Sequence, residues 1–175
     1  MQKNLVLLGM MGVGKSTLGK IVAKKLNLNF IDTDASIEKS CLMKIPEIFK
    51  KNGEKYFRLE EEKEVVKAVK KNKSLIALGG GAFLTKTIRN NILKNCVSIW
   101  LSLDTISLSK RLKWNKKRPL LNKENKLKTI SKLNLERAGI YKLANYKIDC
   151  NNMSKENIVK KIISLYEKHQ IKSEN

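Results

Sequence analysis

A glycine-rich loop near the N-terminus constrains the fold of this chain more than any other feature. Residues 9–16 read Gly-Met-Met-Gly-Val-Gly-Lys-Ser, which fits the pattern G-x-x-x-x-G-K-[ST]. The short apolar run 4–8 before the loop is typical of a buried parallel strand, and apolar residues recur at helical spacing over 18–26 after it. A strand, a glycine loop and a helix in this order can cradle a polyphosphate, because backbone N–H groups and the helix N-terminus attract anions.

Two side chains in this loop suit a nucleotide and its metal ion. Lys15 can reach the β- and γ-phosphates, and the hydroxyl of Ser16 can bind Mg²⁺. The loop therefore predicts an ATP site. Its expected members are Gly12, Val13, Gly14, Lys15, Ser16 and Thr17. The alternative is a glycine-rich turn that binds nothing.

Strands and helices are expected to alternate along the whole chain. The further strands are expected at 29–31, 75–78, 97–101 and 146–150, with helices between them. This order predicts an α/β fold with a five-stranded parallel sheet in a single domain, residues 1–175. Ligands bind at the carboxyl ends of such strands, where Asp32, Asp34 and residues 79–81 should meet the glycine loop.

The segment 114–126 interrupts this alternation. It is polar, basic and without periodicity, and a loop of this length in a compact domain is usually functional or disordered. Beside an ATP site it predicts a mobile lid. Arg118 would then bring a guanidinium group to the phosphoryl oxygens as the lid closes.

The basic residues are informative in two ways, through their total charge and through the small number of arginines. The formal net charge is +21, but lysines occur along the entire chain, which favours genome composition over a nucleic-acid-binding face as the cause. Only five of the 37 basic residues are arginines, and arginine alone offers a planar fork for carboxylate or phosphate. The arginines are therefore candidate ligand contacts, with Arg89 expected to be an ordinary surface residue. They are Arg58, Arg89, Arg111, Arg118 and Arg137.

Two acids and three glycines complete the candidate site. One of Asp32 and Asp34 could hold the metal beside Ser16, and the other could orient or deprotonate an attacking hydroxyl. The alternative is a capping turn with Asp34 as the helix N-cap. Residues 79–81 are all glycine, which would let another molecule lie directly on the backbone. Arg58 could hold an acidic substrate group with Glu61 as its support, or the two could be a surface pair.

The remaining chemistry-bearing residues exclude several classes of protein. The three cysteines, Cys41, Cys96 and Cys150, have no metal-ligand spacing and predict reduced thiols in a cytoplasmic protein. The only histidine, His169, is expected to be solvated, which excludes a histidine-based triad or metal centre. No apolar run is long enough for a membrane span, and no signal peptide is expected.

Six motifs together resemble the shikimate kinase family over residues 3–166. They are G-M-M-G-V-G-K-S-T, D-T-D, F-R-x-x-E, G-G-G-A, R-P-L-L and E-R-x-x-x-Y. The resemblance implies a P-loop kinase fold and ATP-dependent phosphorylation of the 3-hydroxyl of shikimate, on the route to chorismate and the aromatic amino acids. It also implies a monomer with ATP and shikimate as small-molecule partners, Mg²⁺ as cofactor, and no nucleic-acid or membrane partner.

The resemblance also assigns roles to individual residues. The substrate-binding region would span about 33–61, where Asp34 would bind the shikimate hydroxyls and act as base. Arg58 and Arg137 would clamp the carboxylate over Gly79, Gly80 and Gly81. Ser16 and Asp32, the latter through water, would hold Mg²⁺, while Lys15 and Arg118 would stabilise the phosphoryl group and Arg111 would pack on adenine. Residues 151–153 offer no clear match to the family's adenine contact.

Two other readings remain open at this stage. A gluconate kinase or a nucleoside monophosphate kinase would share the same fold. A P-loop regulatory or nucleic-acid-binding protein without catalysis is the more distant alternative, which would need its lysines on one face.

Overall fold

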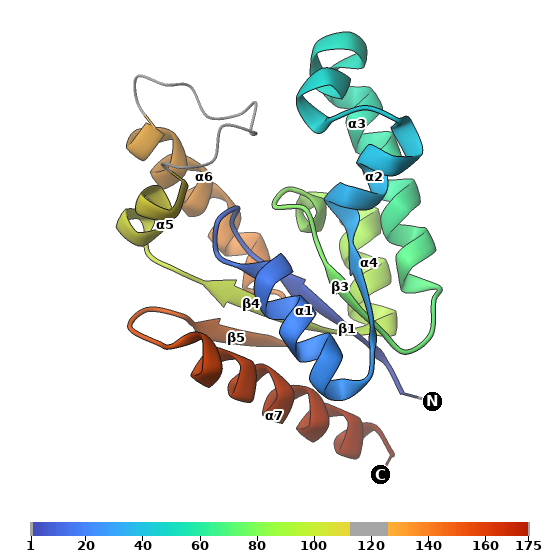
Figure 1. Ribbon diagram of the computed structural model, residues 1–175, viewed down its shortest axis with the longest axis vertical. Coiled ribbons are helices and arrows are strands. Elements are labelled where there is room, and N and C mark those ends of the chain that lie inside the picture. Colours follow the sequence, from blue (N-terminus) through green and yellow to red (C-terminus); the bar gives the residue numbers. More distant parts are fainter. Residues whose placement is uncertain (1, 113–125, 175) are drawn as a thin grey trace.

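The computed structural model describes residues 2–112 and 126–174, and within them strands and helices alternate (Figure 1). The predicted lid and its Arg118 lie outside the described residues, apart from the lid's last residue. The strands are β1 (Asn4–Leu8), β2 (Asn29–Asp32), β3 (Ser74–Ala77), β4 (Cys96–Ser102) and β5 (Tyr146–Asp149). The helices are α1 (Lys15–Leu26), α2 (Thr33–Cys41), α3 (Ile45–Val69), the 3₁₀ turn η1 (Ala82–Leu84), α4 (Lys86–Asn95), α5 (Thr105–Leu112), α6 (Lys126–Tyr141) and α7 (Lys155–Glu174).

The five strands form one parallel sheet in the order β2-β3-β1-β4-β5. The central strand β1 is buried along its whole length, and its Leu5 pairs with Leu75 of β3 on one side and Val97 of β4 on the other. The predicted α/β fold is confirmed. Because all strands run the same way, the loops that follow β1, β2 and β3 open at one edge of the sheet.

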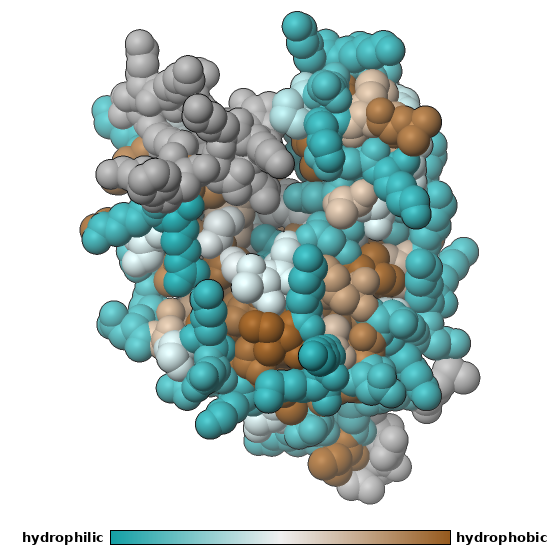
Figure 2. All heavy atoms as spheres, in the orientation of Figure 1, coloured by the Kyte–Doolittle hydropathy of each residue, from teal (hydrophilic) through white to brown (hydrophobic). Residues whose placement is uncertain are grey.

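Helices cover both faces of this sheet. Figure 1 shows α1 and α7 in front of the strands and α4 behind them, and α1 packs against α7. No described helix is long and apolar enough to cross a membrane. Figure 2 shows hydrophilic residues spread over most of the face in view, with smaller apolar areas between them, so they do not gather into one block there.

The segment from α2 into α3 has a small hydrophobic core of its own. Ile37, Ile48 and Phe57 are buried together, apart from the main core around the sheet. Helix α3 is kinked at Gly53, which has a non-helical backbone conformation. Its φ of 79° lies in the left-handed region, which breaks the helical path without ending the element.

The prediction that His169 is solvated is only partly right, because the residue is partly buried. Helix α7 carries this residue back over β5, where the hydroxyl of Tyr146 lies 3.2 Å from His169 Nδ1 and the two rings meet edge to face. Burial, with smaller contributions from Lys3 and Lys172, lowers the pKa of the imidazole. The polar sequence near the C-terminus suggested exposure, but the long helix docks it.

Candidate functional site

The glycine loop after β1 curls around the side chain of Lys15. Gly12 and Gly14 have φ values of 82° and 106°, in the left-handed region, and α1 begins at Lys15 directly afterwards. Lys15 is buried, and its Nζ donates hydrogen bonds to the carbonyls of Gly9 (2.8 Å) and Met10 (3.1 Å). The ammonium group therefore lies within the loop, in the position from which it can reach a phosphate.

The predicted magnesium ligands lie against each other. Ser16 Oγ donates to Asp32 Oδ2 at 2.5 Å, which brings the first turn of α1 to the end of β2. The other oxygen of this carboxylate accepts from the backbone N–H groups of Asp34 and Ala35, so Asp32 is the N-cap of α2. The alternative of a capping turn is thus correct in kind, but the cap is Asp32 and not Asp34.

A hydroxyl and a single carboxylate fit Mg²⁺ with a nucleotide. Among the described residues no group of three or more His, Cys, Asp or Glu side chains could hold a metal ion by itself. Mg²⁺ commonly keeps several waters and is bound by one or two carboxylates together with substrate phosphates. Ser16 and Asp32 beside the glycine loop supply the protein part of such a site.

Residues 79–81 are the point where the charged side chains converge. A Cβ atom on Gly79 would lie 2.5 Å from Asp34 Oδ1 and 3.0 Å from Glu61 Oε1. One on Gly80 would lie 3.4 Å from Arg137 Nη1, and one on Gly81 would lie 2.6 Å from Arg58 Nη1. A side chain on Gly79 or Gly81 would therefore displace Asp34 or Arg58, whereas Gly80 is in ordinary contact with Arg137.

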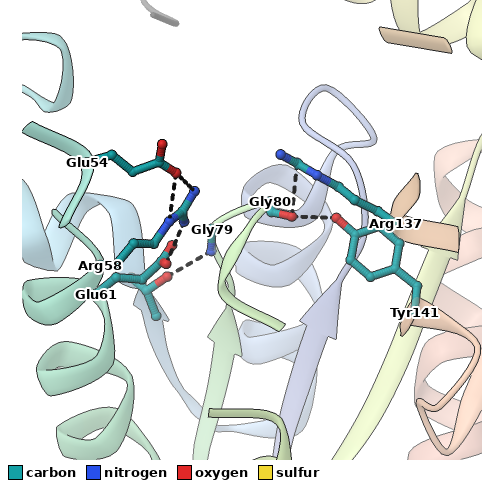
Figure 3. Close-up of polar contacts among 8 residues, drawn as sticks. Glu54, Arg58, Glu61, Gly79, Gly80, Arg137 and Tyr141 are labelled. Carbon is teal, nitrogen blue, oxygen red and sulfur yellow. Dashed lines mark hydrogen bonds and ion pairs between the residues drawn. The ribbon is translucent and has the colours of Figure 1, made fainter. Parts of the chain in front are cut away.

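Arg58 is held by two acids on α3 (Figure 3). Its Nη1 lies 2.7 Å from Glu61 Oε2, and its Nη2 and Nε lie 3.0 and 3.2 Å from Glu54 Oε1. Glu61 is only 1% exposed, so this is no ordinary surface pair. Burial raises the pKa of the Glu61 carboxyl and Asp34 adds to the rise, while Arg58 and Arg137 oppose it.

Arg137 approaches the same glycines from the opposite side, on α6 (Figure 3). It is 5% exposed, and its Nη1 donates to the carbonyl of Gly80 at 3.2 Å and contacts Met10 Sδ at 4.0 Å. Arg137 takes part in none of the ion pairs between described residues. Within the described residues its hydrogen bonds are to neutral groups, and such a buried guanidinium group favours an incoming anion.

Comparison with known proteins decides the family. A family model described as "Shikimate kinase" matches residues 11–167. The chain belongs to the shikimate kinase family. A shikimate kinase of Bartonella henselae is 40% identical over 159 residues, which cover 91% of this chain and 76% of that protein. The predicted family and enzyme class, a phosphotransferase, are confirmed.

Comparison with solved structures supports the same family and distinguishes it from the gluconate kinase alternative. A shikimate kinase from Acinetobacter baumannii, solved in complex with shikimate, superposes with a TM-score of 0.92 at 30% identity and covers 97% of this chain and 96% of that one. A gluconokinase from Sinorhizobium meliloti 1021 covers 97% and 94%, with a TM-score of 0.64 at 13% identity, so it shares the fold alone.

The other arginines of this shikimate kinase family member have separate positions. Arg111 on α5 donates to the carbonyl of Val13, which places it beside the glycine loop. Arg89 is in none of the ion pairs found in the part of the chain that the structure describes. Its Nη1 instead donates to the carbonyls of Phe83 and Leu84, at the end of the turn that follows the glycines.

Two buried hydroxyls of the kinase were missed in the sequence. Thr33 Oγ1 accepts a hydrogen bond from the N–H of Gly79 at 2.9 Å, and the hydroxyl of Tyr141 donates to the carbonyl of Gly80. Signals for both were present, because Thr33 lies between the two acids and Tyr141 follows Arg137 by one helical turn. Together they hydrogen-bond to the backbone of two successive glycines.

Proposed function

We propose that this kinase transfers the γ-phosphoryl group of ATP to the 3-hydroxyl of shikimate, in the synthesis of chorismate and the aromatic amino acids. The observation that supports the proposal most strongly is the convergence of Arg58 and Arg137 on residues 79–81. Two guanidinium groups on either side of a surface without side chains suit a flat, carboxylate-bearing ring lying on the backbone.

The charges around the glycines favour an acidic acceptor. Arg58 already has Glu54 and Glu61 as partners, whereas the bonds of Arg137 are to neutral groups. A substrate carboxylate would supply the missing anion to Arg137 and share the exposed side of Arg58. Gluconate carries a carboxylate and AMP a phosphate, and arginine binds either group, so both belong in the test.

Asp34 is the residue that we assign to the acceptor hydroxyl. Its Oδ1 lies against Gly79, between the substrate side of the glycines and the start of α2. From there it can orient the hydroxyl and take its proton as phosphoryl transfer proceeds. Lys15 and Arg118 would neutralise the charge that develops on the transferred group, and Arg111 beside Val13 would pack on the adenine.

Mg²⁺ is the cofactor that we assign, with Ser16 and Asp32 as its protein ligands, the latter through water. Bound with ATP, the ion would neutralise part of the charge on the phosphates. Asp32 can serve it through Oδ2 while Oδ1 continues to cap α2, so binding the metal does not cost the helix its cap.

We also propose a single domain that works as a monomer in the cytoplasm. Cys41, Cys96 and Cys150 are free thiols, and burial raises the pKa of Cys96 to about 12 and that of Cys150 to about 11, which keeps both protonated and unreactive. Light scattering on the purified protein measures the oligomeric state directly.

The deciding experiment is a coupled assay of ADP release with Mg²⁺ and ATP. Shikimate, gluconate, AMP and no acceptor are compared at equal concentrations. ADP release that depends on shikimate alone supports the proposal, and phosphate located on the 3-hydroxyl by NMR completes it. Turnover with gluconate or AMP instead of shikimate would overturn it.

A further inference from the structure

A phenol group holds the backbone at the centre of the candidate site. Tyr141 is the last residue of α6 and is 1% exposed. Its hydroxyl donates to the carbonyl oxygen of Gly80, the same atom that accepts from Arg137 Nη1 (Figure 3). A carbonyl oxygen has two lone pairs, so these two donors fill its capacity.

The ring of Tyr141 is fixed independently of this bond. It packs against Trp100 of β4, with ring centroids 5.8 Å apart and planes inclined by 50°. Trp100 is itself buried in the sheet. The hydroxyl is therefore presented to Gly80 by a rigid support, and burial raises its pKa, so it stays a neutral donor at physiological pH.

Fixing the Gly80 carbonyl fixes more than one atom. The peptide bonds of the described residues are all trans, and a trans peptide is planar. The N–H of Gly81 therefore points opposite to the Gly80 carbonyl, and its direction is set by the same bond. Neither residue has a Cβ, so side-chain sterics at these two positions do not restrict rotation of this peptide.

We propose that Tyr141 is a positioning residue for the acceptor substrate: its hydroxyl sets the plane of the Gly80–Gly81 peptide and the orientation of Arg137. Arg137 lies four residues earlier on α6, so both side chains leave the same face of the helix and meet at one carbonyl. With Tyr141 on one lone pair, Arg137 is confined to the other. This inference rests on the proposed function for the identity of the substrate. The contacts of Tyr141 and Arg137 with Gly80 are independent of that identity.

The chain contains a close control for this arrangement. Tyr166 on α7 is also 1% exposed, and its hydroxyl donates to a backbone carbonyl, that of Lys3, at 2.6 Å. The same carbonyl accepts from Gln170 Nε2 at 2.9 Å, one helical turn away. Tyr166 thus has the same burial, the same bond and a second donor, but it lies far from residues 79–81 in the fold.

The experiment compares Tyr141→Phe with Tyr166→Phe. Both variants lose one buried hydroxyl, so both should unfold at slightly lower temperatures by similar amounts. Tyr141→Phe alone should raise the KM for shikimate about fivefold to tenfold, with the KM for ATP within about twofold of the wild type. Equal KM values for shikimate in the two variants would overturn the positioning role.

A second measurement needs no substrate. In ¹⁵N spectra of the ligand-free protein, the amide resonance of Gly81 should shift and its hydrogen exchange should accelerate in Tyr141→Phe but not in Tyr166→Phe. Unchanged Gly81 signals in Tyr141→Phe would overturn the inference even if the wild type phosphorylates shikimate. Wild-type protein without shikimate-dependent turnover would overturn the proposed function instead, and the Gly81 signals would still decide the role of Tyr141.

Discussion

Replacing Arg58 by lysine separates its contribution to stability from its contribution to substrate binding. The guanidinium group makes three bonds on α3, one to Glu61 and two to Glu54. A lysine ammonium keeps the charge and can retain the bond to Glu61, so the variant loses mainly the contacts with Glu54. Glu54 is 59% exposed, and such surface pairs contribute about 0.3–0.5 kcal/mol. Arg58→Lys should therefore lower Tm by less than about 2 °C.

The effect on substrate binding should be much larger. An ammonium group cannot reproduce a two-point grip on a carboxylate, and one lost hydrogen bond to a charged group costs about 1.5–3 kcal/mol. That range corresponds to an increase of roughly 10- to 150-fold in the KM for shikimate. The KM for ATP should stay near the wild-type value, because Arg58 approaches the glycines after β3 and not the loop after β1.

Steady-state kinetics by ADP release, with thermal unfolding of the same samples, checks both halves of this expectation. The control is Glu54→Gln, which weakens the same ion pair but leaves the guanidinium group and Glu61 in place. It should match Arg58→Lys in Tm and the wild type in KM. An unchanged KM in Arg58→Lys would refute the reasoning, and so would an equal rise in KM in Glu54→Gln.

Three further variants test other parts of the site. Lys15→Ala should lower kcat by more than about 100-fold in the ADP-release assay, with circular dichroism unchanged, because the ammonium that meets the phosphates is lost. Gly79→Ala places a Cβ 2.5 Å from Asp34 Oδ1 and should lower kcat about 100-fold by displacing that carboxylate, whereas kcat within twofold of wild type would show that the carboxylate is not needed there. The pKa of Glu61 is raised in the folded protein, so the wild type loses stability as pH rises through that pKa. The Tm of Glu61→Gln minus the Tm of the wild type should therefore increase from pH 4 to pH 7. The KM of this variant for shikimate should also rise, because Arg58 loses its buried partner.

The local parts of this structure were predictable because local residues determine them. The strand, glycine loop and helix around Lys15 follow from a buried apolar run, from glycines at left-handed positions and from helical spacing, all within about 20 residues. The alternation of strands and helices fixes a parallel sheet in the same way, since parallel strands need a crossover between them. The position of the strand-end acids at one edge of the sheet can then be predicted without further information.

The parts that depend on tertiary packing were harder to predict. Arg137 and Gly80 are 57 residues apart in sequence, and nothing in either segment says that they share a hydrogen bond. Glu61 lies among charged residues on α3, a pattern that indicates an exposed face, but that face turns toward residues 79–81 and buries it. Sequence spacing alone suggests that Glu61 and Arg58 form an exposed ion pair, because a helical pattern does not say what packs against each face.

The three glycines explain why charged groups from three helices can act as one site. Asp34, Glu61, Arg58 and Arg137 come from α2, α3 and α6 and all lie against residues 79–81, where an added Cβ would crowd the first three and touch Arg137. Their mutual spacing is therefore set by contact with a single stretch of backbone. That backbone is in turn held by hydroxyl groups that carry no charge, so its position does not depend on the protonation of the residues around it. A change to this support should therefore alter acceptor binding without altering the site's titration, whereas a change to Glu61 should alter both.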